Sequence, residues 1–134
     1  MMNIRNEVEK ILEEINERRG EVSLSEIRNL FKSIGFEEVT PEYLASLLNA
    51  SLEEAREYVN FLMSSRESIA GNLVFSSVTP LLFLRHRESD LFIVVEYNCV
   101  LSRGGVFTGT FYTADMLRHD FELFKELVEK ERTH

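Results

Sequence analysis

Three arginines and a glycine pair are the residues whose types and spacing could bind an anion. Arg85 and Arg87 flank the start of one predicted turn, and Arg103 precedes Gly104 and Gly105 at another. If the intervening strands form a meander, the first and third turns lie at the same end of the sheet. Arginine donors beside unobstructed glycine N–H groups suit a phosphate or a carboxylate. The alternative is that acids in the first turn neutralise these arginines locally.

Two acids, Asp90 and Glu96, flank an apolar run and raise the question of metal-assisted phosphodiester hydrolysis. The pair faintly resembles the acid pair of restriction-like nucleases, whose pattern has a lysine two residues after the second acid, whereas Asn98 stands there. Asp90 is also a typical turn residue. The histidines are scattered without the spacing of metal ligands. We therefore expect no enzyme activity, with nuclease chemistry as a distant alternative, and no cofactor.

A twelve-residue window from Ile15 to Glu26 resembles the calcium loop of EF-hand proteins. Gly20 stands at its glycine position and Glu26 at its terminal carboxylate position. However, Ile15 and Arg19 occupy positions that must supply oxygen ligands. The window therefore predicts a corner between two helices, without calcium or any other metal.

Composition restricts the classes of partner. The chain has 134 residues, of which 44% are hydrophobic and 28% charged, as expected for a folded domain. Its net charge of −8 opposes non-specific attraction to nucleic acids and anionic membranes. Neither an export signal nor a membrane-spanning run is visible, so we expect a cytoplasmic protein. Abundant glutamate without glutamine suggests a thermophilic source.

Capping signals and apolar spacing predict four helices before residue 66 and one at the end of the chain. Ser23 with Glu26 and Ser51 with Glu54 match the capping box, and Thr40 precedes a proline at the first helical position. The final helix follows Thr113 and carries its apolar residues on one stripe, which predicts packing onto a sheet. The predicted ranges are 3–19, 23–35, 41–48, 52–65 and 113 onward.

After Gly71 the apolar period changes to two, which predicts antiparallel strands. We expect strands at 73–78, 81–86, 91–97, 99–102 and 106–112, with 91–95 central because it is apolar on both faces. The predicted fold is therefore α+β. A helical, winged-helix-like half spans 1–80, and a β-meander packed by the terminal helix spans 81–134; the two share one core.

The segment TPEYLASLLNASLEEAREYVNFLMSS, from Thr40 to Ser65, resembles the helix-turn-helix of winged-helix proteins. A short helix, a tight turn at Asn49, a longer capped helix and a hairpin follow one another as in that layout. The stretch after Leu81 loosely resembles the C-terminal region of archaeal winged-helix transcriptional regulators. The resemblance implies a transcription-regulator-like, homodimeric protein in which the second helix of the pair contacts DNA.

The chemistry of that second helix is unusual for a DNA reader. Its first turns carry glutamates, whereas base recognition uses Arg, Lys, Asn or Gln. Arg56, Asn60 and Arg66 are the candidate residues for contacting DNA or a protein partner. An adaptor or assembly module that binds a protein through the same fold, without DNA, is the alternative function.

Overall fold

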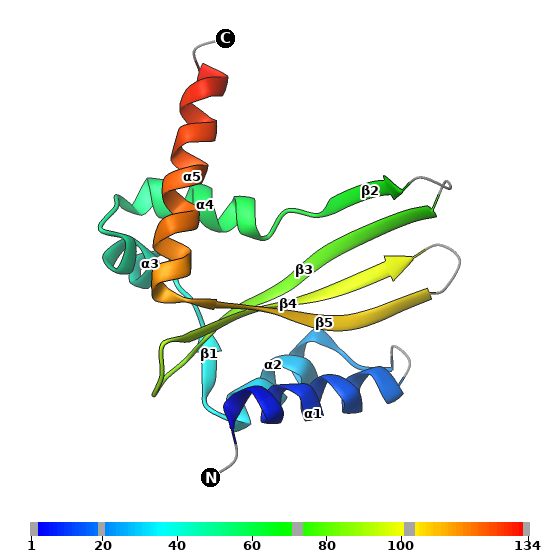
Figure 1. Cartoon of the computed structure of the whole chain (residues 1–134). Helices are drawn as coiled ribbons and strands as arrows, with labels where there is room; N and C mark the ends of the chain where they lie inside the picture. The colour runs from blue at the N-terminus through cyan, green and yellow to red at the C-terminus, as the bar shows by residue number, and fades with distance from the viewer. Residues whose placement is uncertain (1–2, 19–20, 71–73, 101–103, 133–134) are drawn as a thin grey trace.

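The computed structural model describes residues 3–18, 21–70, 74–100 and 104–132. They form an α+β fold in which helices pack on both faces of an antiparallel sheet (Figure 1). None of the helices within these residues is both long and apolar enough to cross a membrane. The elements are α1 (Ile4–Glu17), α2 (Leu24–Ser33), β1 (Phe36–Glu38), α3 (Pro41–Leu48), α4 (Leu52–Leu62), β2 (Arg66–Ala70), β3 (Val74–His86), β4 (Leu91–Val100), β5 (Gly104–Thr113) and α5 (Ala114–Arg132).

The helices begin where the sequence predicts. Ser23 and Ser51 each accept a hydrogen bond from the main chain three residues later, and each forms a complete capping box. Thr40 accepts from the Tyr43 N–H ahead of α3. Asn49 ends α3 in the left-handed conformation, with φ 53°, which asparagine tolerates better than most residues. The helix pair from 41 to 62 is therefore confirmed.

The sheet is a meander of three long strands with two short strands on one edge. β3, β4 and β5 pair antiparallel in chain order. Residues 76–78 of β3 pair with both β2 and β4, and residues 84–85 pair with both β1 and β4. Because a strand has two edges, β1 and β2 lie on the same edge of β3, at its opposite ends.

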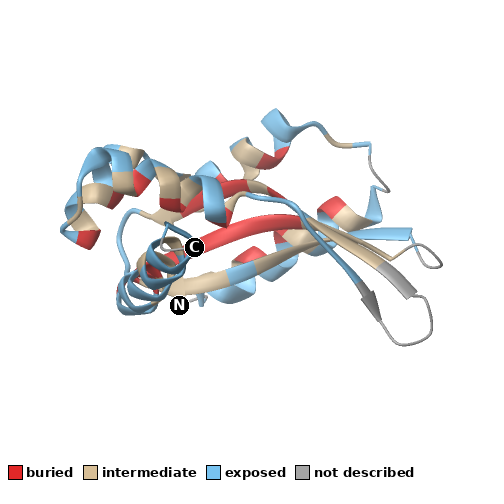
Figure 2. Cartoon of the chain, turned by 90° about the horizontal axis from the view of Figure 1, so that it is seen from above, coloured by how far each residue is buried: buried red, intermediate tan, exposed pale blue. Residues whose placement is uncertain are grey.

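Each face of the sheet carries its own apolar cluster. One face packs against α1 and α2 through residues such as Ile15, Phe31 and Ile93. The other packs against α3, α4 and α5 through residues such as Tyr58 and Phe121. Figure 2 shows buried residues along the middle of the sheet and on the inner sides of the helices. Leu91–Glu96 of β4 is buried throughout, so the prediction of a central, doubly covered strand is confirmed.

The predicted strand boundaries need correction. Strands 73–78 and 81–86 are one strand, β3, because Pro80 pairs with Glu96 at a bulge and does not end the strand. Strands 91–97 and 99–102 likewise merge in β4, whose residue Asn98 pairs with Val106. β1 and β2 were not predicted. The boundary between residues 80 and 81 thus falls inside β3.

The continuity of β4 also overturns the expected arginine cluster. The β3–β4 turn at residues 87–90 adjoins the start of β4, whereas Gly104 pairs with Val100 at its end. Arg85 and Arg87 are therefore at one end of the sheet, and Gly104 and Gly105 at the other. The expectation that these residues lie at the same end of the sheet is wrong, because it required an additional turn at Asn98. Arg103 lies outside the described residues.

Candidate functional site

An ion pair between a buried carboxylate and an exposed guanidinium forms the centre of the first candidate site. Among the described residues, Glu96 is the one charged side chain that is buried. Its carboxylate accepts a hydrogen bond from Arg66 Nη2 at 2.7 Å and another from the Thr110 hydroxyl. Arg66 comes from β2 and its side chain is 64% exposed, whereas that of Glu96 is 4% exposed. The guanidinium therefore approaches a buried carboxylate from the solvent side.

A cavity of about 250 Å³ opens between this pair, the C-terminal end of α4 and α5. We call it the Glu96 pocket. Asp120 of α5 and Tyr112 of β5 line it beside Glu96 and Arg66, and Phe61 of α4 forms part of its wall. The pocket thus contains two carboxylates and one guanidinium.

Two tyrosines in this region stay protonated at neutral pH. Tyr58 is fully buried and its hydroxyl donates a hydrogen bond to Asp120. Burial, reinforced by Asp120, raises the Tyr58 pKa far above its ordinary value. Burial also raises the pKa of Tyr112, and the charges of Asp120 and Glu96 raise it further. Neither phenol therefore adds negative charge to the pocket.

The sheet face beyond the pocket carries polar side chains among apolar ones. Alternate residues of β4 share this face, so Asn98 follows Glu96 on it, and Asn98 donates to the Thr108 hydroxyl of β5. On the neighbouring strands, the hydroxyls of Ser68 and Ser76 lie 2.7 Å apart. In Figure 1 this end of the sheet extends beyond α3, α4 and α5. The same face that builds the apolar cluster under the helices thus carries hydrogen-bonded polar side chains outside them, although Val78 and Val106 flank Asn98 there.

One face of α5 adds an exposed apolar stripe, defined by Met116, Leu123 and Leu127. Their exposed fractions are 50%, 46% and 54%. Residues three, four or seven apart lie on one side of a helix, so the stripe shares its side with Asp120. Phe61, which is 46% exposed, packs against Phe124 of α5 with ring centroids 4.9 Å apart. Phe61, which also lines the Glu96 pocket, thus connects the pocket wall to an aromatic side chain of α5.

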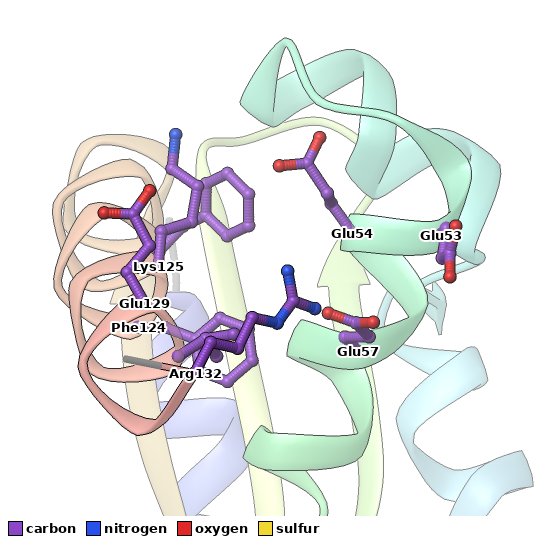
Figure 3. Close-up of a pocket in the computed structure, with 9 residues that line it drawn as sticks. Glu53, Glu54, Glu57, Phe124, Lys125, Glu129 and Arg132 are labelled. Atoms are coloured by element: carbon purple, nitrogen blue, oxygen red, sulfur yellow. The ribbon is translucent and has the colours of Figure 1, made fainter. Parts of the chain in front are cut away.

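A second cavity, of about 400 Å³, lies between the N-terminal half of α4 and the C-terminal half of α5. We call it the acidic groove. Glu53, Glu54 and Glu57 line it from α4, and Lys125 and Arg132 from α5. Figure 3 shows Arg132 extending toward Glu57, while Glu53 points away from the groove. The Ser51 N–H, which donates to the Glu54 carboxylate, lowers the pKa of Glu54.

The residues predicted to contact DNA or a partner are not brought together as one set. Arg56 and Asn60 are exposed on α4. Arg66 is instead paired with Glu96. Arg85 pairs with Glu37 and stacks over the Tyr43 ring at 4.1 Å.

The remaining predicted residues lie apart from this region. Arg87 is exposed in the β3–β4 turn, and its N–H donates to the Gly35 carbonyl. Gly104 and Gly105 begin β5. Within the part of the chain that the structure describes, no three His, Cys, Asp or Glu side chains gather as a metal site.

The sequence analysis did not identify Tyr58 or Asp120 as site residues, and it did not predict that Glu96 is buried and paired. The three come from α4, α5 and β4, so no local spacing connects them. The one available signal was Glu96 itself, a charge ending an otherwise apolar run. Polar residues in such positions need partners, and Arg66 is that partner here.

Comparisons with known proteins supply no relative from which a role could be transferred. No protein-family model matches the chain, and neither a curated protein nor a solved structure shows significant similarity to it.

Proposed function

We propose that the protein is an adaptor that binds a basic, amphipathic helix of a partner protein along the α5 stripe. The observation that carries this proposal is the stripe itself, in which Leu123 and Leu127 are about half exposed. Exposed apolar patches commonly mark interaction surfaces. An amphipathic helix laid on them would place its apolar residues there at helical spacing.

The energy available from this surface is adequate for a specific contact. Burying one large apolar side chain completely contributes about 1.5–3 kcal/mol. The stripe and Phe61 are already half-buried, so each contributes a fraction of that. At most interfaces a few central, well-packed residues contribute most of the binding energy.

Charge supports a basic partner. One of the polar residues on the stripe side of α5 is Asp120, and the Glu96 pocket, which Asp120 lines, contains Glu96. The whole chain carries a net charge of −8. Lysine or arginine residues flanking the apolar anchors of a partner would be attracted, and acidic partners repelled.

A transcription-regulator-like role remains a prediction. The α3–α4 pair followed by the β2–β3 hairpin favours it. The position of two glutamates on α4 disfavours direct contact of this helix with DNA bases, because Glu54 and Glu57 line the acidic groove opposite α5. Carboxylates at the end of a recognition helix repel phosphates.

The test compares three probes: a designed Leu/Lys amphipathic helix, a Leu/Glu helix of the same length, and random-sequence duplex DNA. Fluorescence anisotropy at low and moderate salt measures each affinity. We expect the Leu/Lys peptide to bind and the Leu/Glu peptide not to bind. Leu127→Ser should weaken binding by about tenfold, whereas Leu24→Ser, which changes an exposed leucine on the opposite layer, should not.

Two outcomes would overturn the proposal. Salt-sensitive DNA binding that is unaffected by Leu127→Ser, without peptide binding, would favour the regulator. Concentration-dependent dimerisation that Leu127→Ser abolishes would assign the stripe to a second copy of this chain, as the predicted homodimer requires. Size-exclusion chromatography of both proteins distinguishes that case.

A further inference from the structure

The Glu96 pocket has an uncompensated negative charge. Glu96 and Asp120 line it together with a single cation, Arg66. Arg66 donates a hydrogen bond from Nη2 to Glu96, and most of its side chain is exposed to solvent. Charges in a partly enclosed site are screened less than charges on the surface, so the excess carboxylate attracts a cation.

Asp120 is the carboxylate with room for such a ligand. It accepts from the Tyr58 hydroxyl, which holds it in position from the buried side. A carboxylate has about four acceptor sites, so one neutral donor leaves capacity for a further donor from the pocket. Because Tyr58 stays protonated, this positioning bond persists at neutral pH.

The walls and the size restrict the ligand. Phe61 and Tyr112 line the pocket, and aromatic faces attract ammonium and guanidinium groups. A volume of about 250 Å³ is below the usual range for drug-sized ligands, so a compact molecule fits. Glu96 already accepts from both Thr110 and Arg66, whereas Asp120 accepts from Tyr58, so a further donor is favoured at Asp120.

We propose that the Glu96 pocket binds a compact organic cation, a guanidinium or primary ammonium group, which pairs with Asp120 in the field of Glu96. The aromatic side chains contact its apolar part. Arg66 closes the outer side and competes with the ligand as a like charge. This site does not depend on the partner helix of the adaptor proposal, because a free small molecule suffices to test it.

The experiment is calorimetric titration of the whole chain with n-butylguanidinium, with n-butylurea as the neutral molecule of nearly the same shape. We expect saturable one-to-one binding of the cation and none of the urea. Asp120→Asn removes the charge and retains the shape and an acceptor for Tyr58. It should weaken binding by about tenfold or more.

Two further variants complete the test. Asp115→Asn removes the same charge from an exposed position of α5, outside the pocket, and should leave binding unchanged. Arg66→Met removes the competing cation and should tighten binding, with circular dichroism checking that the fold is retained. Equal losses in Asp120→Asn and Asp115→Asn would reduce the effect to general surface charge and overturn the proposal. Equal binding of the cation and the urea, or no saturable binding, would also overturn it.

Discussion

The side chain of Asn16 binds both main-chain polar groups of Phe107. Its Nδ2 donates to the Phe107 carbonyl at 3.0 Å, and the Phe107 N–H donates to its Oδ1 at 2.7 Å. Phe107 belongs to β5, the last strand of the sheet, so these groups point away from β4. One amide on α1 thus satisfies the strand edge as a neighbouring strand would, and it ties the helix layer to the sheet.

Asn16→Ala should lower the free energy of unfolding by about 1–3 kcal/mol, because it leaves two half-buried main-chain groups without partners. Chemical denaturation measures the change. Asn6→Ala, at an exposed position of the same helix, is the control and should have little effect. Asn16→Asp keeps the acceptor and loses the donor, so its stability should also fall. Equal stabilities of all four proteins would show that the bonds are exchanged for water without loss.

Alkaline pH should destabilise the protein through Tyr58 and Tyr112. Their pKa values are raised in the folded state, chiefly by burial, whereas an unfolded tyrosine ionises near pH 10. Below about pH 10 both states keep the protons, and the stabilisation is fully present. Above it the unfolded state releases protons that the folded state retains, so the free energy of unfolding falls. Denaturation midpoints between about pH 8 and pH 11 measure this, and Tyr58→Phe should flatten the decline. An unchanged slope in that variant would contradict the assignment.

The apolar contacts of the α3–α4 pair should give a graded series of destabilisation. Leu44 is fully buried, Val59 is half-buried against the same cluster, and Leu52 is 37% exposed. Leu44→Ala should cost about 2–5 kcal/mol through lost burial and a cavity, and Val59→Ala about 1–3 kcal/mol. Leu52→Ala is the matched control and should cost less than either. Thermal and denaturant unfolding test the order, and a cost for Leu52 equal to that for Leu44 would contradict this packing.

Gly105 should resist substitution for a steric reason. A Cβ at this position would lie 1.9 Å from the Tyr97 hydroxyl oxygen, and the Tyr97 ring packs at a tilt against Phe107 with centroids 4.9 Å apart. Gly105→Ala should therefore displace the ring and cost about 1–3 kcal/mol, with a change in the near-ultraviolet circular dichroism. At Gly104, where φ is +81° and nothing is within 4 Å of such a Cβ, alanine should cost backbone energy without that spectral change. Identical spectra for both variants would show that Tyr97 moves freely.

The helices were predictable from sequence because each begins with a local signal. Ser23, Thr40 and Ser51 bond main-chain groups within the same turn, so their effect does not depend on the rest of the fold. The strands were less predictable, since pairing joins distant residues. Pro80 and Asn98 are typical turn residues, yet both lie inside strands because β3 and β4 pair along their length.

The candidate site was harder to predict than the fold. Arg66 and Glu96 are thirty residues apart and meet only because β3 pairs with β2 on one edge and with β4 on the other. Asp120 lies outside the buried apolar positions of α5, so the helical periodicity predicts that its side chain faces solvent. Its importance depends on Tyr58, whose hydroxyl reaches it from another helix. Such a site follows from tertiary topology, which composition and periodicity do not encode.

The shared edge of β3 has a mechanical consequence for α3 and α4. The chain leaves that edge at β1, forms the two helices, and returns to the same edge at β2. The helix pair is thus held at both ends by strands that pair with β3. It cannot move outward as a rigid body unless β1 or β2 first separates from β3. We therefore expect the amides of α3 or α4 to exchange with solvent in the same opening event as those of β1 or β2, which native-state hydrogen exchange measures.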